Sequence, residues 1–260
     1  MTRDYVQDPL QVLSLGGGTQ STAMILMIQD GLLEKPDLVL FADTGSELPD
    51  TLEMIERCKA ICQDLEIEFD VVRSPKKALH LQYLEDGSLP LIGFRTCTTE
   101  WKIRPIYRRI RQVVGMGRGN VLASSWIGIT TDEDHRARES EHKWIERKYP
   151  LIDLDYSRED CVKYCQDRGY QVRKSGCFMC PYQPIHQWER LQREWPEYFQ
   201  EAIILEDKAR ANGFTGGLLR SRESIHRFNH THTLEDFGFK IGSVQDDDEF
   251  NCDPGSACFL

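Results

Sequence analysis

The chain has 260 residues, of which 40% are hydrophobic and 28% are charged, a composition that supports a packed core and excludes global disorder. Its formal net charge of −10 argues against bulk, non-specific nucleic-acid binding, which depends on a positive surface. The sequence contains no apolar run of about 18 residues, and its polar N-terminus lacks the features of a secretory signal, so we expect a cytoplasmic protein that does not enter a membrane.

The first half of the chain alternates short apolar runs with helical patterns. We expect strands at residues 12–15, 37–42, 67–72 and 121–129, and helices at residues 22–33 and 49–65. This alternation favours an α/β fold with a parallel sheet and helices on both faces. Ligands of such folds bind beyond the carboxyl ends of the strands, where this chain carries a glycine-rich loop, an Asp-Thr-Gly segment and a polar segment after Ile129.

The second half is more polar and more helical. A helix is expected at residues 157–168, with Ser157 as N-cap and Asp160 at the third helical position, and residues 184–210 are expected to form one or two helices. We therefore expect a nucleotide-binding α/β domain at residues 1–150, followed by a cysteine-containing helical region and tail at residues 151–260.

The glycine-rich loop, Gly16-Gly17-Gly18, stands between the first strand and the first helix. Glycines let the backbone approach a phosphate, and the first N–H groups of a helix have no internal partner and can face an anion. Ser21 and Thr22 add hydroxyl donors. No lysine precedes Ser21, so this is not the loop that ends in Gly-Lys-Ser/Thr, and it also lacks the third glycine of the dinucleotide fingerprint. The alternative is a tight turn without a ligand.

Segments along the chain resemble one family. Residues 14–22 resemble the pyrophosphate-binding loop of the PP-loop ATPases, and residues 41–48 resemble the segment after the second strand in the phosphoadenosine phosphosulfate reductase branch of that superfamily. Residues 97–105, 149–152, 157–160 and 175–181 look like later blocks of the same branch, in the same order. The resemblance implies an adenine nucleotide alpha hydrolase-like fold: a five-stranded parallel sheet with helices on both faces and a smaller helical C-terminal part. It also implies either cleavage of ATP between the α- and β-phosphates or handling of an adenylated substrate.

The resemblance also assigns roles to individual residues. The nucleotide would be bound by Ser14, Gly16, Gly17, Gly18, Gln20, Ser21, Thr22, Asp43, Thr44 and Gly128. Asp43 would lie near the nucleotide or a Mg²⁺ ion, and Lys102 and Arg104 would offset phosphate charge. An aspartate before Thr-Gly is also a common turn or helix-capping residue, so that role for Asp43 stays open.

The chain departs from the reductase pattern after the fourth predicted strand. Reductases of this branch carry an arginine there that can meet a sulfate, whereas Thr130 stands at this place. Arg136 follows and could serve instead. The missing charge favours ATP itself as the ligand. Residues 132–134 are acidic and could help to hold Mg²⁺ or form a solvated loop.

The chain has nine cysteines, an odd number, and no secretion signal, so metal ligation or thiol chemistry is favoured over a disulfide framework. In the light of the resemblance, Cys97, Cys177 and Cys180 could hold a [4Fe–4S] cluster and leave one iron open to sulfur or an outside ligand. Zinc is the alternative, since thiolates suit it as well.

The remaining cysteines allow two interpretations each. Cys161 and Cys165 could supply a fourth ligand or pack as small buried residues, and packing is also expected of the similar pair at residues 58 and 62. Cys252 and Cys258 lie in the tail, where sulfonucleotide reductases carry a nucleophilic cysteine, so either thiol could attack or relay sulfur. The neighbouring acidic residues would raise the pKa of these thiols and weaken them, and an inert tail is the alternative.

Three functions follow from these motifs. In the first, an ATP pyrophosphatase adenylates an acceptor and then admits sulfur from a cysteine desulfurase, with DNA or tRNA as acceptor, as in the phosphorothioation and thiolation members of the family. In the second, a sulfonucleotide reductase uses Cys252 or Cys258 with thioredoxin. In the third, the chain is a non-catalytic nucleotide-binding iron–sulfur module. The basic stretch at residues 102–118 would suit a nucleic-acid backbone or form a solvated helix face.

Overall fold

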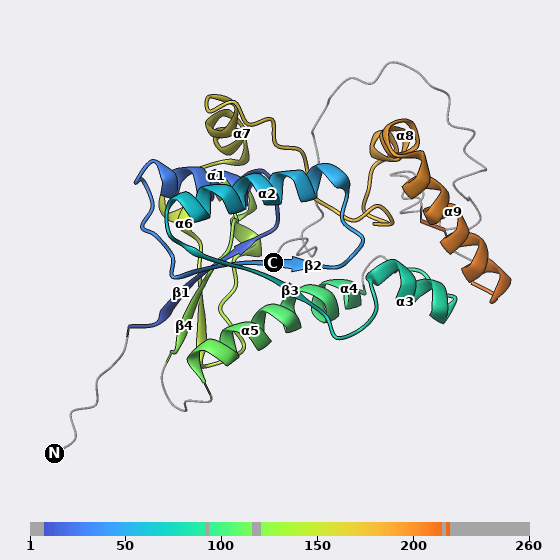
Figure 1. The fold of residues 1–260 in the computed structure, drawn as a ribbon, viewed down its shortest axis with the longest axis horizontal. Coiled ribbons are helices and arrows are strands. Elements are labelled where there is room, and N and C mark those ends of the chain that lie inside the picture. Colours follow the sequence, from blue (N-terminus) through green and yellow to red (C-terminus); the bar gives the residue numbers. More distant parts are fainter. Residues whose placement is uncertain (1–7, 92–93, 116–120, 215–216, 219–260) are drawn as a thin grey trace.

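The computed structural model describes residues 8–91, 94–115, 121–214 and 217–218. Five parallel strands form one sheet in the order β3-β2-β1-β4-β5, as the resemblance implies (Figure 1). The strands are β1 Leu10–Leu15, β2 Leu38–Asp43, β3 Glu68–Arg73, β4 Ala123–Trp126 and β5 Ile145–Lys148. The strand order reverses between β1 and β4, and this switch point is where open parallel sheets bind ligands.

Helices cover both faces of the sheet (Figure 1). One face carries α1 Thr19–Gln29, α2 Pro49–Asp64, α6 Pro150–Asp153 and α7 Arg158–Gln166, whose apolar side chains share a core with β1 and β2. The other face is covered by α5 Arg104–Val114, where Ile106 and Ile110 pack on Val12 and Leu40. A sheet buried on both sides explains why β1 and β2 are nearly continuous apolar runs.

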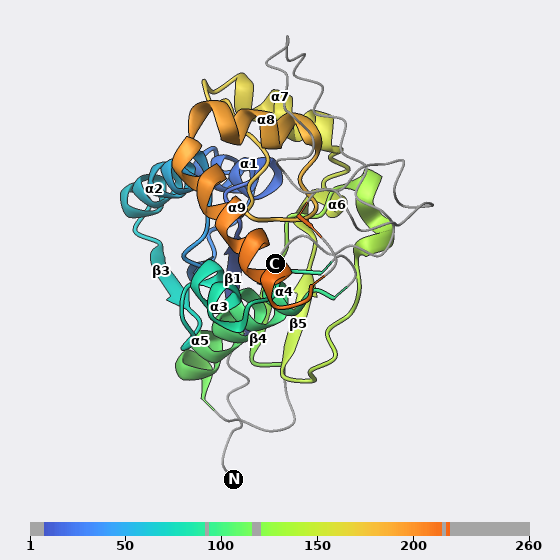
Figure 2. The same cartoon turned by 90° about the vertical axis from the view of Figure 1, so that its right-hand side faces the viewer.

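A further core lies at the carboxyl ends of the strands. It is formed by α3 Leu79–Asp86, α8 Ile185–Glu194, α9 Pro196–Ala211 and the segment around Phe178, together with the buried ring of Trp101. Figure 2 shows α9 running from α8 toward α3 in front of the strand ends. This arrangement places the second half of the chain over the end of the sheet where ligands are expected.

Element boundaries differ from the sequence prediction where apolar patterning is a poor guide. The first helix spans Thr19–Gln29 rather than 22–33, because its polar first turn is buried at the glycine loop and Gly31, with φ +75°, ends it. The fourth strand is only Ala123–Trp126 rather than 121–129.

The predicted helix after Ser157 is confirmed, including a capping box in which Ser157 and Asp160 bond reciprocally. Residues 184–210 form two helices, since Pro196 begins a new one. The predicted domain boundary at residue 150 falls between β5 and α6. Buried residues of α6 and α7 belong to the same hydrophobic cluster as those of α1. In the described part of the chain, no helix is long and apolar enough to cross a membrane.

Candidate active site

The glycine loop forms a strand-to-helix turn that only small residues allow. Gly17 has φ +71°, and a Cβ there would come within 3.1 Å of Thr51 and 3.2 Å of Ile55 on α2. Gly18 is the N-cap of α1 and provides no side-chain cap. The turn therefore leaves the start of α1 uncapped by a side chain, as an anion site at a helix N-terminus requires.

Ser21 and Gly128 fix the shape of this loop. The Ser21 hydroxyl accepts a hydrogen bond from the N–H of Gly16 at 3.2 Å and donates one to the carbonyl of Gly18 at 3.2 Å. Gly128 follows β4 on the neighbouring side, and a Cβ there would approach the Ser21 nitrogen to 3.2 Å. Gly128 thus lets the two loops at the switch point come close together.

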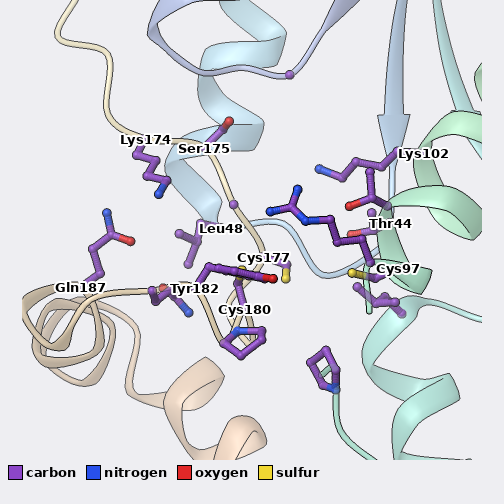
Figure 3. A pocket seen from close by; sticks show the side chains of 18 of the residues that line it. Thr44, Leu48, Cys97, Lys102, Lys174, Ser175, Cys177, Cys180, Tyr182 and Gln187 are labelled. Atoms are coloured by element: carbon purple, nitrogen blue, oxygen red, sulfur yellow. The ribbon is translucent and has the colours of Figure 1, made fainter. Parts of the chain in front are cut away.

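One cavity joins the glycine loop to three thiols (Figure 3). Gly16 and Thr44 line it, and so do Cys97, Cys177 and Cys180, which come from two distant segments. The segment that carries Cys177 is held at the end of β2, because residues 47 and 177 pair as an isolated antiparallel bridge.

Lys102 enters this cavity from a π-helical turn, Thr99–Ile103, which leads into α5. Its ammonium lies 3.4 Å from the Glu47 carboxylate, whose side chain is 1% exposed and also accepts a hydrogen bond from the Thr44 hydroxyl at 3.0 Å. Burial alone would lower the pKa of Lys102, but the charges of Glu47 and Cys177 raise it overall, so the side chain stays cationic beside the thiols.

The three thiols influence one another. Burial raises the pKa of Cys97, and the neighbouring Cys180 raises it further. A hydrogen bond with Cys180, followed by burial, raises the pKa of Cys177 well above that of an ordinary thiol. Burial and the neighbouring thiols thus outweigh the Lys102 ammonium, which lowers the pKa of Cys97, and a bound metal ion or cluster would favour the thiolate forms.

Comparison with known proteins agrees with this architecture. The model of the phosphoadenosine phosphosulfate reductase domain family matches residues 11–192, more than half of the chain. The chain belongs to this family. Two uncharacterized proteins of Methanocaldococcus jannaschii are 23% and 21% identical to it, over 73% and 88% of the chain. The chain covers 46% and 48% of these relatives, so it spans about half of their length.

Two solved structures are similar to this reductase-domain chain in fold. One is the phosphoadenylyl-sulfate reductase of Candida auris in a phosphate complex, with a TM-score of 0.48, 12% identity and coverage of 65% of this chain and 77% of that one. The other is the U34-tRNA thiolase of Methanococcus maripaludis with its [4Fe–4S] cluster, with a TM-score of 0.46, 15% identity and coverage of 81% of this chain and 75% of that one.

Several predicted nucleotide residues of this family member lie around the loop rather than in the cavity. The Ser14 hydroxyl lies 3.5 Å from that of Ser125 in the buried sheet, and the Gln20 amide lies 3.4 Å from Glu133. Thr22 is fully buried, and its hydroxyl contacts the Cys58 thiol. Among the predicted nucleotide residues, only Gly16 and Thr44 therefore line the described cavity.

The three predicted charged residues other than Lys102 are engaged outside the cavity. Asp43 pairs with Arg73 at 2.6 Å across neighbouring strands and accepts a hydrogen bond from the N–H of Gly45. Arg104 pairs with Glu100, and its side chain is 63% exposed. Arg136 is buried and donates to Glu133. A nucleotide or Mg²⁺ at Asp43 would have to compete with Arg73.

Several basic side chains in the described part of the basic stretch, residues 102–115, have partners within the molecule. Arg109 pairs with Glu68 and Asp70 of β3, and the Arg111 guanidinium lies 3.8 Å from the centre of the Trp144 ring. Arg118 lies outside the described residues. Arg109 and Arg111 are thus engaged within the molecule, whereas Lys102 lines the cavity.

The other cysteines separate into two groups. Cys58, Cys62, Cys161 and Cys165 are at most 1% exposed and belong to the core beneath α1, which supports the packing interpretation over a fourth ligand. The predicted tail nucleophiles, Cys252 and Cys258, lie outside the residues that the structure describes.

Cys97, Cys177 and Cys180 are of the ligand type that iron–sulfur clusters and zinc use, and all three line one cavity, but they are not arranged there as a ligand set. Within the described ranges, no group of three or more His, Cys, Asp or Glu side chains is arranged to hold a metal ion. The acidic residues 132–134 lie in a 3-10 helix, Thr131–Arg136, and Asp132 accepts a hydrogen bond from the N–H of Arg158. A metal centre in this chain is therefore a proposal.

Sequence reasoning assigned no role to several residues that line the cavity or support it. Glu47 holds Lys102, and Lys174, Tyr182 and Arg95 line the cavity with the thiols. Lys174 and Tyr182 flank the Cys-x-x-Cys segment in the sequence, so their nearness to this motif could have identified them as candidate site residues. Arg95 and Glu47 reach the site only through the packing of the loops, which no local pattern shows.

Proposed function

We propose that this chain is an ATP pyrophosphatase that adenylates an acceptor oxygen and then directs sulfur to the activated position. The observation that carries the proposal is the single cavity lined by both the glycine loop and three thiols, Cys97, Cys177 and Cys180. An enzyme that only hydrolysed ATP would have no use for thiols beside the phosphate site. With Gly16 and the thiols on one cavity, activation of the acceptor and transfer of sulfur would take place side by side.

In the first step, the acceptor oxygen attacks the α-phosphorus of ATP, an O–P bond forms, and pyrophosphate leaves with the electron pair of the broken bond. The glycine loop and the start of α1 would hold the terminal phosphates through backbone N–H groups. Lys102 would stabilise the charge that develops, and its pairing with Glu47 fixes its position in advance. Mg²⁺ would supply further charge stabilisation at the phosphates.

In the second step, a hydrosulfide ion attacks the activated atom and AMP leaves with the acceptor oxygen. A cysteine desulfurase is the proposed sulfur donor, and if it delivers a persulfide to one thiol, a second thiol can release the sulfur as hydrosulfide and form a disulfide. That cycle consumes two electrons, which an external thiol reductant would return. Cys177 and Cys180 lie within hydrogen-bond contact of each other, so one could attack a persulfide on the other once it is deprotonated.

A [4Fe–4S] cluster, or zinc as the alternative, would be held by Cys97, Cys177 and Cys180. When bound, a cluster with three protein ligands supplies an open iron that can carry sulfur. The chain's own residues would still bind ATP, orient the acceptor and keep Lys102 at the phosphates.

The family match favours a second candidate, a sulfonucleotide reductase that releases sulfite. There a tail thiol would attack the sulfate sulfur, and a dithiol such as thioredoxin would supply the two electrons. Thr130 is fully buried where that reaction would place an arginine, so we rank it second.

Alkylation under protection tests the shared cavity. Metal-free protein is treated with iodoacetamide without oxygen, with or without a non-hydrolysable ATP analogue and Mg²⁺, and the modified peptides are quantified. We expect the analogue to slow modification of Cys97 and Cys177 and to leave unprotected a cysteine introduced at the exposed Leu52. Equal modification rates with and without the analogue would contradict a common site.

A further inference from the structure

The mouth of the shared cavity exposes aromatic and apolar surface. Phe94 is 71% exposed and Leu91 is 46% exposed, and both line the cavity. The Arg95 guanidinium lies 5.0 Å from the centre of the Tyr182 ring, which lines the same cavity. A largely exposed aromatic side chain next in sequence to an arginine in cation–π contact with a tyrosine is typical of a binding surface.

The cavity has two chemically different ends. Lys174 and Ser175 lie on one side, whereas Tyr182 and Cys180 lie on the other (Figure 3). The side with Lys174, Lys102 and the glycine loop suits the phosphates of a nucleotide. The mouth formed by Phe94, Arg95 and Tyr182 suits a flat, uncharged ring, because aromatic and guanidinium faces stack on nucleobases.

From this arrangement we infer that Phe94, Arg95 and Tyr182 stack an unpaired nucleobase of the acceptor, and that sulfur replaces an exocyclic oxygen of that base. This inference rests on the proposed function and selects between its two acceptors. Arg95 could pair with a backbone phosphate, but a phosphodiester has no flat apolar face to cover the exposed Phe94 ring, whereas a base would bury its faces against Phe94 and Tyr182.

The chemistry of a base oxygen balances in two steps. The carbonyl oxygen of the base attacks the α-phosphorus, pyrophosphate leaves, and the ring nitrogen loses its proton. Hydrosulfide then adds to the same carbon, AMP leaves with the oxygen, and the hydrosulfide proton ends on the ring nitrogen. The product is a thiocarbonyl, and no oxidant is needed.

Binding of oligonucleotides to the full chain tests the inference. The probes are a fluorescently labelled single-stranded RNA of 12 nucleotides and an abasic oligomer of the same length and charge, both at about 0.1 M salt. We expect the RNA to bind about tenfold more tightly than the abasic oligomer, and F94A and Y182A each to weaken RNA binding about tenfold. I204A, which changes a 48% exposed side chain on α9, is the matched control and should bind like the wild type.

ATP affinity, measured by calorimetry on the same variants, separates the base from the adenine of ATP. We expect F94A and Y182A to bind ATP as the wild type does. Equal affinity for the RNA and the abasic oligomer, or loss of ATP binding in F94A, would overturn the inference. If the wild-type protein prefers the RNA to the abasic oligomer but releases no pyrophosphate from ATP, the proposed function is overturned and the base-stacking surface still stands.

Discussion

The buried pair between Glu47 and Lys102 allows a quantitative prediction. The Glu47 side chain is 1% exposed and that of Lys102 is 24% exposed, with the charged atoms 3.4 Å apart. Glu47→Gln preserves the shape and can still accept a hydrogen bond from the Thr44 hydroxyl, but it leaves the ammonium without its counter-charge. Removal of one partner from a buried pair costs about 3–5 kcal/mol, and because Lys102 reaches water we expect about 2–3 kcal/mol.

Urea unfolding measures this loss as a shift of the midpoint at unchanged slope, about 1 M for a protein of this size. The double variant E47Q/K102M removes both charges and should recover more than half of the loss. Glu85→Gln is the matched control, because its partner Lys77 lies 2.8 Å away and both side chains are more than half exposed. If E47Q unfolds like Glu85→Gln, or if the double variant is no more stable than E47Q, the pair does not stabilise the site.

The remaining predictions concern the loop, the core thiols and one surface pair. Gly17→Ala should abolish ATP binding in calorimetry, because it strains a residue at φ +71° and places a methyl group 3.1 Å from Thr51. Gly31→Ala is the control, since Gly31 has φ +75° and open space around it. This variant should lose only about 1 kcal/mol of stability and keep ATP binding. Burial raises the pKa of Cys58 and of Cys161 to about 12. Peptide mapping of the native protein should therefore find both thiols unmodified by iodoacetamide at pH 8. Modification of either thiol at a rate faster than global unfolding would contradict their burial. A hydrogen bond from Tyr164 lowers the pKa of Asp30, so the Asp30 carboxylate stabilises the fold at neutral pH, and this contribution is lost as the pH falls below about 4. Asp30→Asn should therefore flatten the pH dependence of the unfolding midpoint below that pH. An unchanged pH dependence would contradict the pairing.

The fold follows from the sequence because the central strands are apolar runs and the glycine loop marks the first turn. β5 was not located from the sequence, since Ile145–Lys148 contains one apolar residue and three charged ones and lies at the sheet edge. Its neighbour β4 provides the backbone partners that make it a strand. Patterning identifies strands that are buried on both faces and misses those that are defined by pairing.

In the candidate site, too, the sequence identified the residues that belong to local motifs and missed the contacts between distant segments. The cysteine motifs and the glycine loop are local patterns, so sequence reasoning named Cys97, Cys177, Cys180 and Gly16, and the structure brings them to one cavity. The partners of charged residues come from distant segments, as in the pairing of Asp43 with Arg73, and no local pattern predicts them.

The most direct test of the central claim is the fate of ATP labelled at the α-phosphate, with released pyrophosphate and phosphate assayed in the same samples. The ATP is incubated with Mg²⁺, single-stranded RNA and hydrosulfide over protein purified without oxygen. The account predicts AMP and pyrophosphate in equal amounts, with no product from the Gly17→Ala variant. ADP and phosphate as products would contradict it, and so would intact ATP together with sulfite release from phosphoadenosine phosphosulfate.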